Sequence, residues 1–142
     1  MPKPLRYLSP IHKAARQIGV HLESRLSADL TPQEGHILSF LRGYAPCPIA
    51  EVISVFGLRG STATSVLDRL EDRGLIKRTP NPEDRRSVLI DISAKGRKAA
   101  DDVQEHVDAL EKAIARRITA EQEEGFKAVM QAIADVTKVK LR

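Results

Sequence analysis

The sequence has no tryptophan, a single cysteine and few aromatic residues of any kind. Its 142 residues include three Phe and two Tyr. One cysteine excludes an intramolecular disulfide and a zinc site built from cysteines. No apolar run approaches the roughly 18 residues of a membrane-spanning helix, and the first ten residues lack the apolar core of a signal peptide. These absences predict a cytoplasmic protein that has no membrane partner.

The composition is that of a folded chain. Hydrophobic residues make up 42% and charged residues 30%, which is too apolar for a disordered protein. The length suits a single domain, residues 1–142, with one main core. The net charge of +4 is mild, so it permits a nucleic-acid partner without requiring one. Phosphate-loop, nucleophile-elbow and paired-carboxylate motifs are absent, and the histidines lack paired helical spacing. We therefore expect no enzyme, no cofactor and no metal site.

Two helices are predicted before residue 44. Ser9 and Pro10 have the residue types of an N-cap and a first helical position, and apolar residues follow at helical spacing. The second helix is expected to open at Thr31 and Pro32. Glu34 lies three residues after Thr31, as in a capping box.

A pair of shorter helices follows, at about residues 48–55 and 61–73. Gly57 and Gly74 are placed to end them. A turn of about four residues separates the two helices. Short helices joined in this way predict a helix-turn-helix.

The periodicity then changes from helical to alternating. Residues 75–79 and 87–92 are predicted to form two strands of a hairpin, joined by a polar, proline-containing loop at 80–86. Ser93 and Thr119 are placed to cap two final helices. The sequence thus predicts a mainly α fold with a small β-hairpin wing: a winged helix-turn-helix over about residues 48–92.

The helix-turn-helix carries the functional interpretation. In such motifs the second helix contacts the DNA major groove through its N-terminal residues. Small hydroxylated side chains can approach phosphates and base edges without filling the groove. The alternative is an ordinary amphipathic helix whose Ser and Thr residues serve in capping. The candidate major-groove residues are Gly60, Ser61, Thr62, Thr64, Ser65 and Arg69.

The hairpin loop favours DNA binding. Arg85 and Arg86 lie where a wing would reach the adjacent minor groove, which attracts arginine when it is narrow. The alternative, when the loop is considered alone, is a solvated charged hairpin tip. Because the loop directly follows the helix-turn-helix, duplex DNA is the predicted partner.

Segment 57–96 resembles the MarR family of winged-helix regulators. The matching motifs are S-T-x-T at 61–64, D-R-L-E-D-R-G-L at 68–75 and D-x-R-S at 84–87. The resemblance implies a DNA-binding transcriptional regulator, expected to be a repressor, that binds a near-palindromic operator as a homodimer. Residues 1–30 and 94–142 would form the dimerisation helices and 31–93 the DNA-binding lobe. The alternative is that the terminal helices pack within one monomer.

The resemblance also implies roles for single residues. Arg86 would enter the minor groove, Asp84 would brace its guanidinium, and Arg85 would contact phosphate. The chain departs from the family's pattern at two positions. Arg59 stands where members often place a capping Ser, and Ser65 stands where they often place a large basic or polar residue.

Members of the family commonly respond to small aromatic or phenolic ligands, or to oxidants through a cysteine. The resemblance implies an effector held between the dimerisation helices and the DNA-binding lobe. Candidate lining residues, each of which also fits a core position, are Ile11, Ile18, Phe40, Leu41, Tyr44 and Val107. Cys47 is expected at the start of the third helix. It has no adjacent basic residue and no second cysteine, so we do not expect oxidant sensing.

A competing function is a winged-helix module that contacts other proteins without sequence-specific DNA binding. Protein interfaces are enriched in aromatic side chains, and this chain has few. The hydroxyl-rich helix and the arginine-bearing loop therefore favour DNA.

Overall fold

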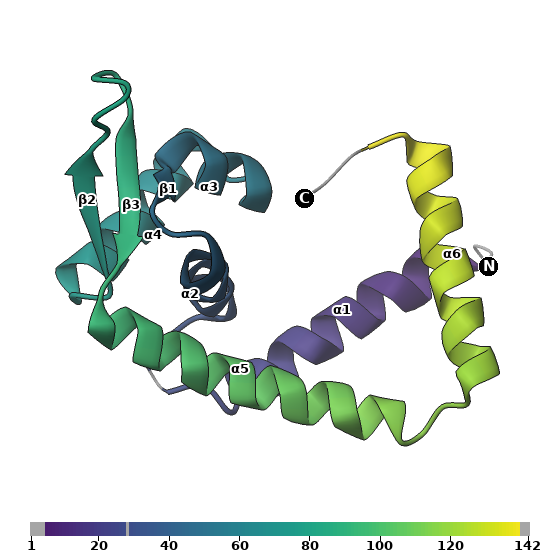
Figure 1. Cartoon of the computed structure of the whole chain (residues 1–142). Helices are drawn as coiled ribbons and strands as arrows, with labels where there is room; N and C mark the ends of the chain where they lie inside the picture. The colour runs from purple at the N-terminus through teal and green to yellow at the C-terminus, as the bar shows by residue number, and fades with distance from the viewer. Residues whose placement is uncertain (1–4, 28, 140–142) are drawn as a thin grey trace.

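The computed structural model describes residues 5–27 and 29–139. Its elements follow the predicted order, with one unpredicted short strand, and the mainly α fold with a hairpin wing is confirmed (Figure 1). The helices are α1 (Leu8–Glu23), α2 (Pro32–Tyr44), α3 (Ile49–Phe56), α4 (Gly60–Asp72), α5 (Ala94–Ala115) and α6 (Ala120–Thr137). The strands are β1 (Cys47–Pro48), β2 (Ile76–Pro80) and β3 (Val88–Ile92).

Three of the predicted helix caps are confirmed. The hydroxyl of Thr31 accepts a hydrogen bond from the backbone N–H of Glu34 at 3.2 Å, and the hydroxyl of Ser93 accepts one from Gly96 at 3.0 Å. At α6, Thr119 and Gln122 exchange both bonds of a capping box. Short polar side chains thus satisfy backbone donors that helical geometry leaves unpaired.

Two predictions about helix starts are wrong. Helix α1 begins at Leu8, so Ser9 lies inside it, and the N-cap residue Tyr7 makes no capping hydrogen bond through its side chain. At α2 the carboxylate of Glu34 does not return to Thr31 to complete a capping box. It pairs with two arginines of α4 instead, because charge-assisted bonds to guanidinium groups are stronger than one bond to a neutral amide.

The sheet has three antiparallel strands in the order β1-β3-β2. In the hairpin, Ile76 pairs with Ile92 and Pro80 with Val88. Pro80 is therefore the last residue of β2, and the prediction that it belongs to the loop is wrong. On the other side of β3, Cys47 pairs with Ile90. A strand of two residues is too short to leave an alternating pattern in the sequence, which is why β1 was not predicted.

The elements α2, α3, α4 and the sheet form one unit, the winged lobe, and the core lies between them. Its central side chains are fully buried: Ile37, Leu38, Leu41, Val52, Leu67, Leu70 and Ile90. Helix α5 adds Ala100 to this core and then runs away from the lobe toward α6 (Figure 1). The buried side chains of α4 pack within this close-packed core, which holds the helix in place.

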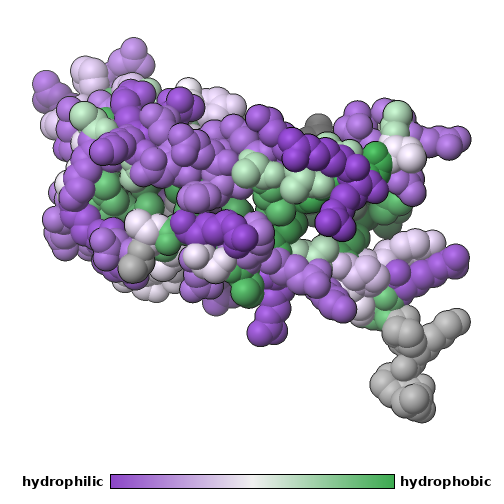
Figure 2. All heavy atoms as spheres, turned by 90° about the horizontal axis from the view of Figure 1, so that it is seen from below, coloured by the Kyte–Doolittle hydropathy of each residue, from purple (hydrophilic) through white to green (hydrophobic). Residues whose placement is uncertain are grey.

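The terminal helices keep much of their apolar surface exposed. None of the α6 residues is buried, and Phe126 on α6 is 60% exposed. The start of α1 and α6 line a cavity of about 640 Å³ whose walls include Tyr7, Val129 and Ile133. Figure 2 shows hydrophobic side chains around a hollow toward this end of the molecule. Within the described residues, no helix is both long and apolar enough to cross a membrane.

Candidate DNA-binding surface

The turn between α3 and α4 is shorter than predicted. It comprises residues 57–59, and α4 begins at Gly60 rather than Ser61. Gly57 ends α3 with a left-handed φ of 59°, a conformation that glycine adopts without steric strain. The N–H of Leu58 then donates to the carbonyl of Ile53 at 3.0 Å. This hydrogen bond closes the tight turn that connects α3 to α4.

Helix α4 has one buried and one exposed face. Its buried side chains are Ala63, Val66, Leu67 and Leu70. The predicted major-groove residues Gly60, Ser61, Thr62, Thr64, Ser65 and Arg69 are all exposed. The spacing of the apolar residues, three or four positions apart, places the small hydroxylated residues opposite the core.

Two of the exposed hydroxyls already donate hydrogen bonds within the helix. Thr64 Oγ1 donates to the carbonyl of Gly60 at 2.9 Å, and Ser65 Oγ donates to that of Ser61 at 3.0 Å. Each oxygen keeps its acceptor lone pairs. In these rotamers the two residues can accept hydrogen bonds from the amino groups of adenine or cytosine, which project into the major groove.

No side chain caps the start of α4. Arg59 occupies the N-cap position with an extended backbone and makes no capping hydrogen bond. Backbone N–H groups in the first turn of a helix lack intrahelical acceptors. Such groups, together with the positive end of the helix dipole, bind phosphate. The departure at Arg59 therefore leaves the first turn of α4 suited to an anion.

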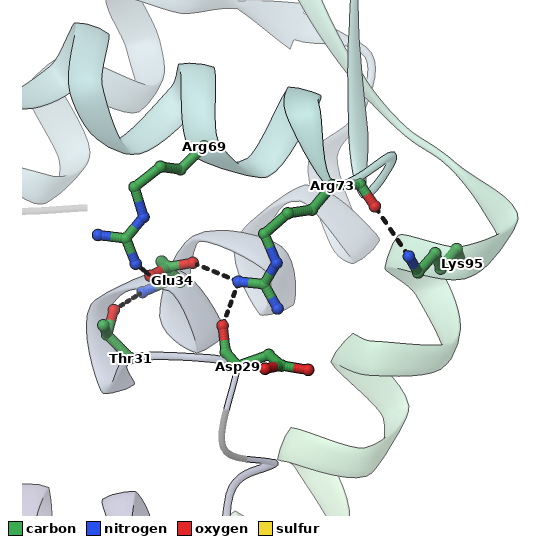
Figure 3. Close-up of polar contacts among 6 residues, drawn as sticks. All are labelled: Asp29, Thr31, Glu34, Arg69, Arg73 and Lys95. Carbon is green, nitrogen blue, oxygen red and sulfur yellow. Dashed lines mark hydrogen bonds and ion pairs between the residues drawn. The ribbon is translucent and has the colours of Figure 1, made fainter.

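Arg69 has a partner inside the protein. Its Nη2 donates to Oε1 of Glu34, a carboxylate that is 1% exposed, while the Arg69 side chain itself remains 57% exposed (Figure 3). Arg73, one turn further along α4, donates through Nη1 to the other oxygen, Oε2, at 3.2 Å. This pairing was not foreseen from the sequence, and it limits the ways in which Arg69 can face DNA.

A second ion-pair cluster joins α4 to the wing. Arg78 of β2 donates to Asp68 and to Glu71 of α4, each at 2.7 Å. Partial burial by itself lowers the pKa of the Arg78 guanidinium, but the hydrogen bond to Asp68 and the charges of Glu71 and Asp68 outweigh it. The net pKa lies above its ordinary value. Arg78 therefore stays charged and links the two candidate DNA-binding elements.

The wing tip is held by two side chains that accept hydrogen bonds from the backbone. Asn81 Oδ1 accepts from the N–H of Glu83, and Asp84 Oδ1 accepts from the N–H of Arg86, both at 3.0 Å. These local bonds order a polar loop. Both Arg85 and Arg86 are exposed on it. Asp84 thus contacts the backbone of Arg86, and its bracing of the Arg86 guanidinium stays a prediction.

Comparison with known proteins agrees with this geometry. Residues 30–88 match the model of the MarR family. The uncharacterized HTH-type transcriptional regulator YwhA of Bacillus subtilis is 34% identical over 100 residues, an alignment that covers 70% of this chain and 72% of YwhA. The chain belongs to the MarR family.

Two further comparisons are informative. The HTH-type transcriptional repressor MdtR of Bacillus subtilis is 32% identical over 75 residues, covering 53% of this chain and 48% of MdtR. The chain thus spans about half of the length of that relative. The crystal structure of the S. aureus MepR–DNA complex superposes with a TM-score of 0.85 and 20% identity, covering 94% of this chain and 99% of that one. At this identity the likeness establishes the fold.

The residues predicted to line an effector pocket are dispersed in the structure. Leu41 is fully buried in the core of the lobe, whereas Ile18 and Tyr44 are 43% and 64% exposed. Tyr44 stacks on Phe40 with ring centroids 4.7 Å apart. Ile11 lines a cavity of about 320 Å³ between α1 and α6, and Val107 is half-buried on α5. A pocket formed by all six residues remains a prediction.

Cys47 lies in β1 rather than at the start of α3, and it is 3% exposed. Burial of this kind shields a thiol from oxidants and from partner thiols. Across residues 5–27 and 29–139, no group of three or more His, Cys, Asp or Glu side chains is arranged to hold a metal ion.

Three charged residues of this MarR-family chain were missed as parts of the site: Glu34, Arg73 and Arg78. The spacing of Arg69 and Arg73 does place them on one side of a helix, as residues four apart always are. Glu34 and Arg69 are separated by 35 positions, however. Such a contact depends on how α2 packs against α4, and no local pattern encodes it.

Proposed function

We propose that this chain is a DNA-binding repressor that recognises a near-palindromic operator as a homodimer, through α4 and the wing of each subunit. The observation that carries the proposal is the exposed, hydroxyl-rich first half of α4 beside a wing tip that presents two arginines. The MarR-family membership, the relative named as a repressor and the fold shared with a protein solved in complex with DNA support it.

The first turns of α4 would enter the major groove. Ser61 and Thr62 would lie nearest the DNA backbone, where their hydroxyls and the uncapped N–H groups suit a phosphate. Thr64 and Ser65 would accept hydrogen bonds from base amino groups. Arg69 is already bonded to Glu34, so only the exposed part of its guanidinium is available to a base edge or a phosphate.

The wing would contact the adjacent minor groove. Arg86 would enter the groove and Arg85 would meet the phosphates that border it. Asp84 would hold the loop in register through the backbone of Arg86. Both guanidinium groups are exposed, so they can reach DNA without rearrangement of the lobe.

The exposed apolar faces of α1 and α6 support a homodimer. A single chain leaves large hydrophobic side chains of both helices in solvent, among them Tyr7, Phe126 and Val136, and such patches mark interaction surfaces. We propose residues 1–30 and 94–142 as the dimerisation helices and 31–93 as the DNA-binding lobe. A twofold dimer would place its two copies of α4 about 34 Å apart, one turn of DNA.

We further propose that the protein acts as a regulator rather than as an enzyme, and that it works in the cytoplasm, where its proposed partner lies. A small aromatic or phenolic effector is the expected signal for release from the operator. Such a ligand would act by favouring one arrangement of the two DNA-binding lobes over another.

Selection of bound duplexes from a random pool tests the proposal directly. The expected result is a near-palindrome with half-sites about 10 base pairs apart, bound by a dimer. A protein-interaction module would enrich no sequence, and that result would overturn the proposal. Enrichment of a single unpaired half-site would retain DNA recognition and reject the dimer.

A further inference from the structure

Glu34 is a buried carboxylate in a position where helix capping does not require one. Of the polar and charged side chains that the structure describes, it is the one in the buried class, with 1% of its surface exposed. Thr31 already caps α2 by accepting from the N–H of Glu34. The carboxylate points away from this cap and toward α4 (Figure 3). Burying a carboxylate is costly unless both of its oxygens are paired. The residues that pair with Glu34 therefore indicate why it is buried.

Both partners come from the candidate recognition helix α4 or its end: Arg69 lies within α4 and Arg73 is its C-cap residue. Arg69 donates to one oxygen of Glu34 and Arg73 donates to the other. The two arginines are one helical turn apart and project from the same side of α4. One carboxylate therefore connects α2 to two side chains, one turn apart, at the C-terminal end of α4.

The same cluster connects α4 to the segments that lead to the terminal helices. Nη1 of Arg73 also donates to the backbone carbonyl of Asp29, between α1 and α2. Lys95, in the first turn of α5, donates to the backbone carbonyl of Arg73 at 2.9 Å. The C-terminal end of α4 is thus hydrogen-bonded both to the segment between α1 and α2 and to the start of α5 (Figure 3).

We propose that Glu34 is a positioning residue that sets sequence discrimination by α4, because it holds the Arg69 guanidinium against the protein. This inference rests on the proposed DNA-binding function. With Glu34 in place, the exposed part of the Arg69 guanidinium meets DNA in one fixed geometry. Without the carboxylate, Arg69 becomes a mobile cation that can meet any phosphate.

Glu34→Gln is the direct test. It keeps the shape of the side chain and removes the charge that holds both arginines. We expect binding to random duplex to tighten and its salt dependence to steepen by about 1.8 units per dimer, because each subunit gains about one phosphate contact. The ratio of operator affinity to random-duplex affinity should fall roughly tenfold, comparable to the loss of one base contact.

Two variants separate positioning from simple destabilisation. In the double variant Glu34→Gln with Arg69→Gln, the steeper salt dependence should disappear, because the released cation is gone. Asp101→Asn is the matched control: it removes a carboxylate that pairs with an exposed arginine, Arg42, between α5 and α2, outside α4 and the wing. This control should leave both the salt dependence and the affinity ratio unchanged.

If Glu34→Gln fails to fold, as judged by its thermal unfolding, Arg69→Gln alone carries the test, since Arg73 still neutralises the buried carboxylate. That variant should lower the affinity ratio without steepening the salt dependence. An unchanged ratio and salt dependence in the folded variants would overturn the inference. Absence of any sequence preference in the wild-type protein would instead reject the proposed function, so the two failures are distinguishable.

Discussion

Replacing Arg86 by alanine removes one exposed guanidinium from the tip of each wing, and its effect on DNA binding can be worked out in advance. Each phosphate-neutralising contact contributes about 0.9 to the slope of log affinity against log salt concentration. A homodimer carries two wings, so the slope should become shallower by about 1.8. Between 50 and 200 mM salt, wild-type affinity should therefore fall about twelvefold more than that of the variant.

The assay is operator binding by fluorescence anisotropy at four salt concentrations. Lys127→Ala is the matched control, because it removes the same charge from α6, where Lys127 pairs with Glu123 and Glu124 at 3.8 and 3.4 Å. The wing tip is ordered by Asn81 and Asp84 through backbone bonds. Arg86→Ala should accordingly leave the fold and the thermal unfolding unchanged.

A second comparison tests where the arginine binds. Replacing A·T by G·C pairs beneath the wing widens the minor groove and weakens its negative potential. This replacement should reduce binding of the wild type more than that of Arg86→Ala. If both proteins respond equally, Arg86 meets only phosphate. If the salt slope of the variant matches that of the wild type, Arg86 makes no contact with DNA, and the reasoning that places it in the minor groove is refuted.

Three further substitutions test the structure beneath this surface. A Cβ atom on Gly96 would lie 2.0 Å from the carbonyl oxygen of Leu75. Gly96→Ala should therefore lower the free energy of unfolding, measured in urea, by about 2–4 kcal/mol. A Cβ atom on Gly43 would meet nothing within 4 Å, so Gly43→Ala should raise the free energy of unfolding by up to about 1 kcal/mol. Equal stability of the two variants would contradict the close approach. Arg78→Met should cost about 1 kcal/mol, a difference that shrinks in 1 M salt because the paired carboxylates are partly exposed; a salt-independent cost would show that packing dominates. Peroxide should leave the operator affinities of wild type and Cys47→Ser equal, since the thiol is 3% exposed; a loss confined to the wild type would identify Cys47 as a sensor.

Local chemistry explains why so much of the fold was predictable. The caps at Thr31, Ser93 and Thr119 depend on residues within three positions of each other, so they are visible in the sequence. The glycine at 57 and the change from helical to alternating periodicity at the wing are equally local. The prediction that Ser9 caps the first helix is wrong because α1 begins one residue earlier, at Leu8, with Tyr7 as its N-cap residue.

The candidate site divides in the same way. The exposed face of α4 and the arginines of the wing follow from the positions of apolar residues and prolines along the chain, and the sequence by itself determined them. The pairing of Glu34 with Arg69 and Arg73, and the addition of β1 to the sheet, were decided only by the tertiary structure. The physical reason is distance along the chain: an ion pair across 35 positions forms only when two helices pack at a particular angle. That angle is set by the whole core, not by any segment of it.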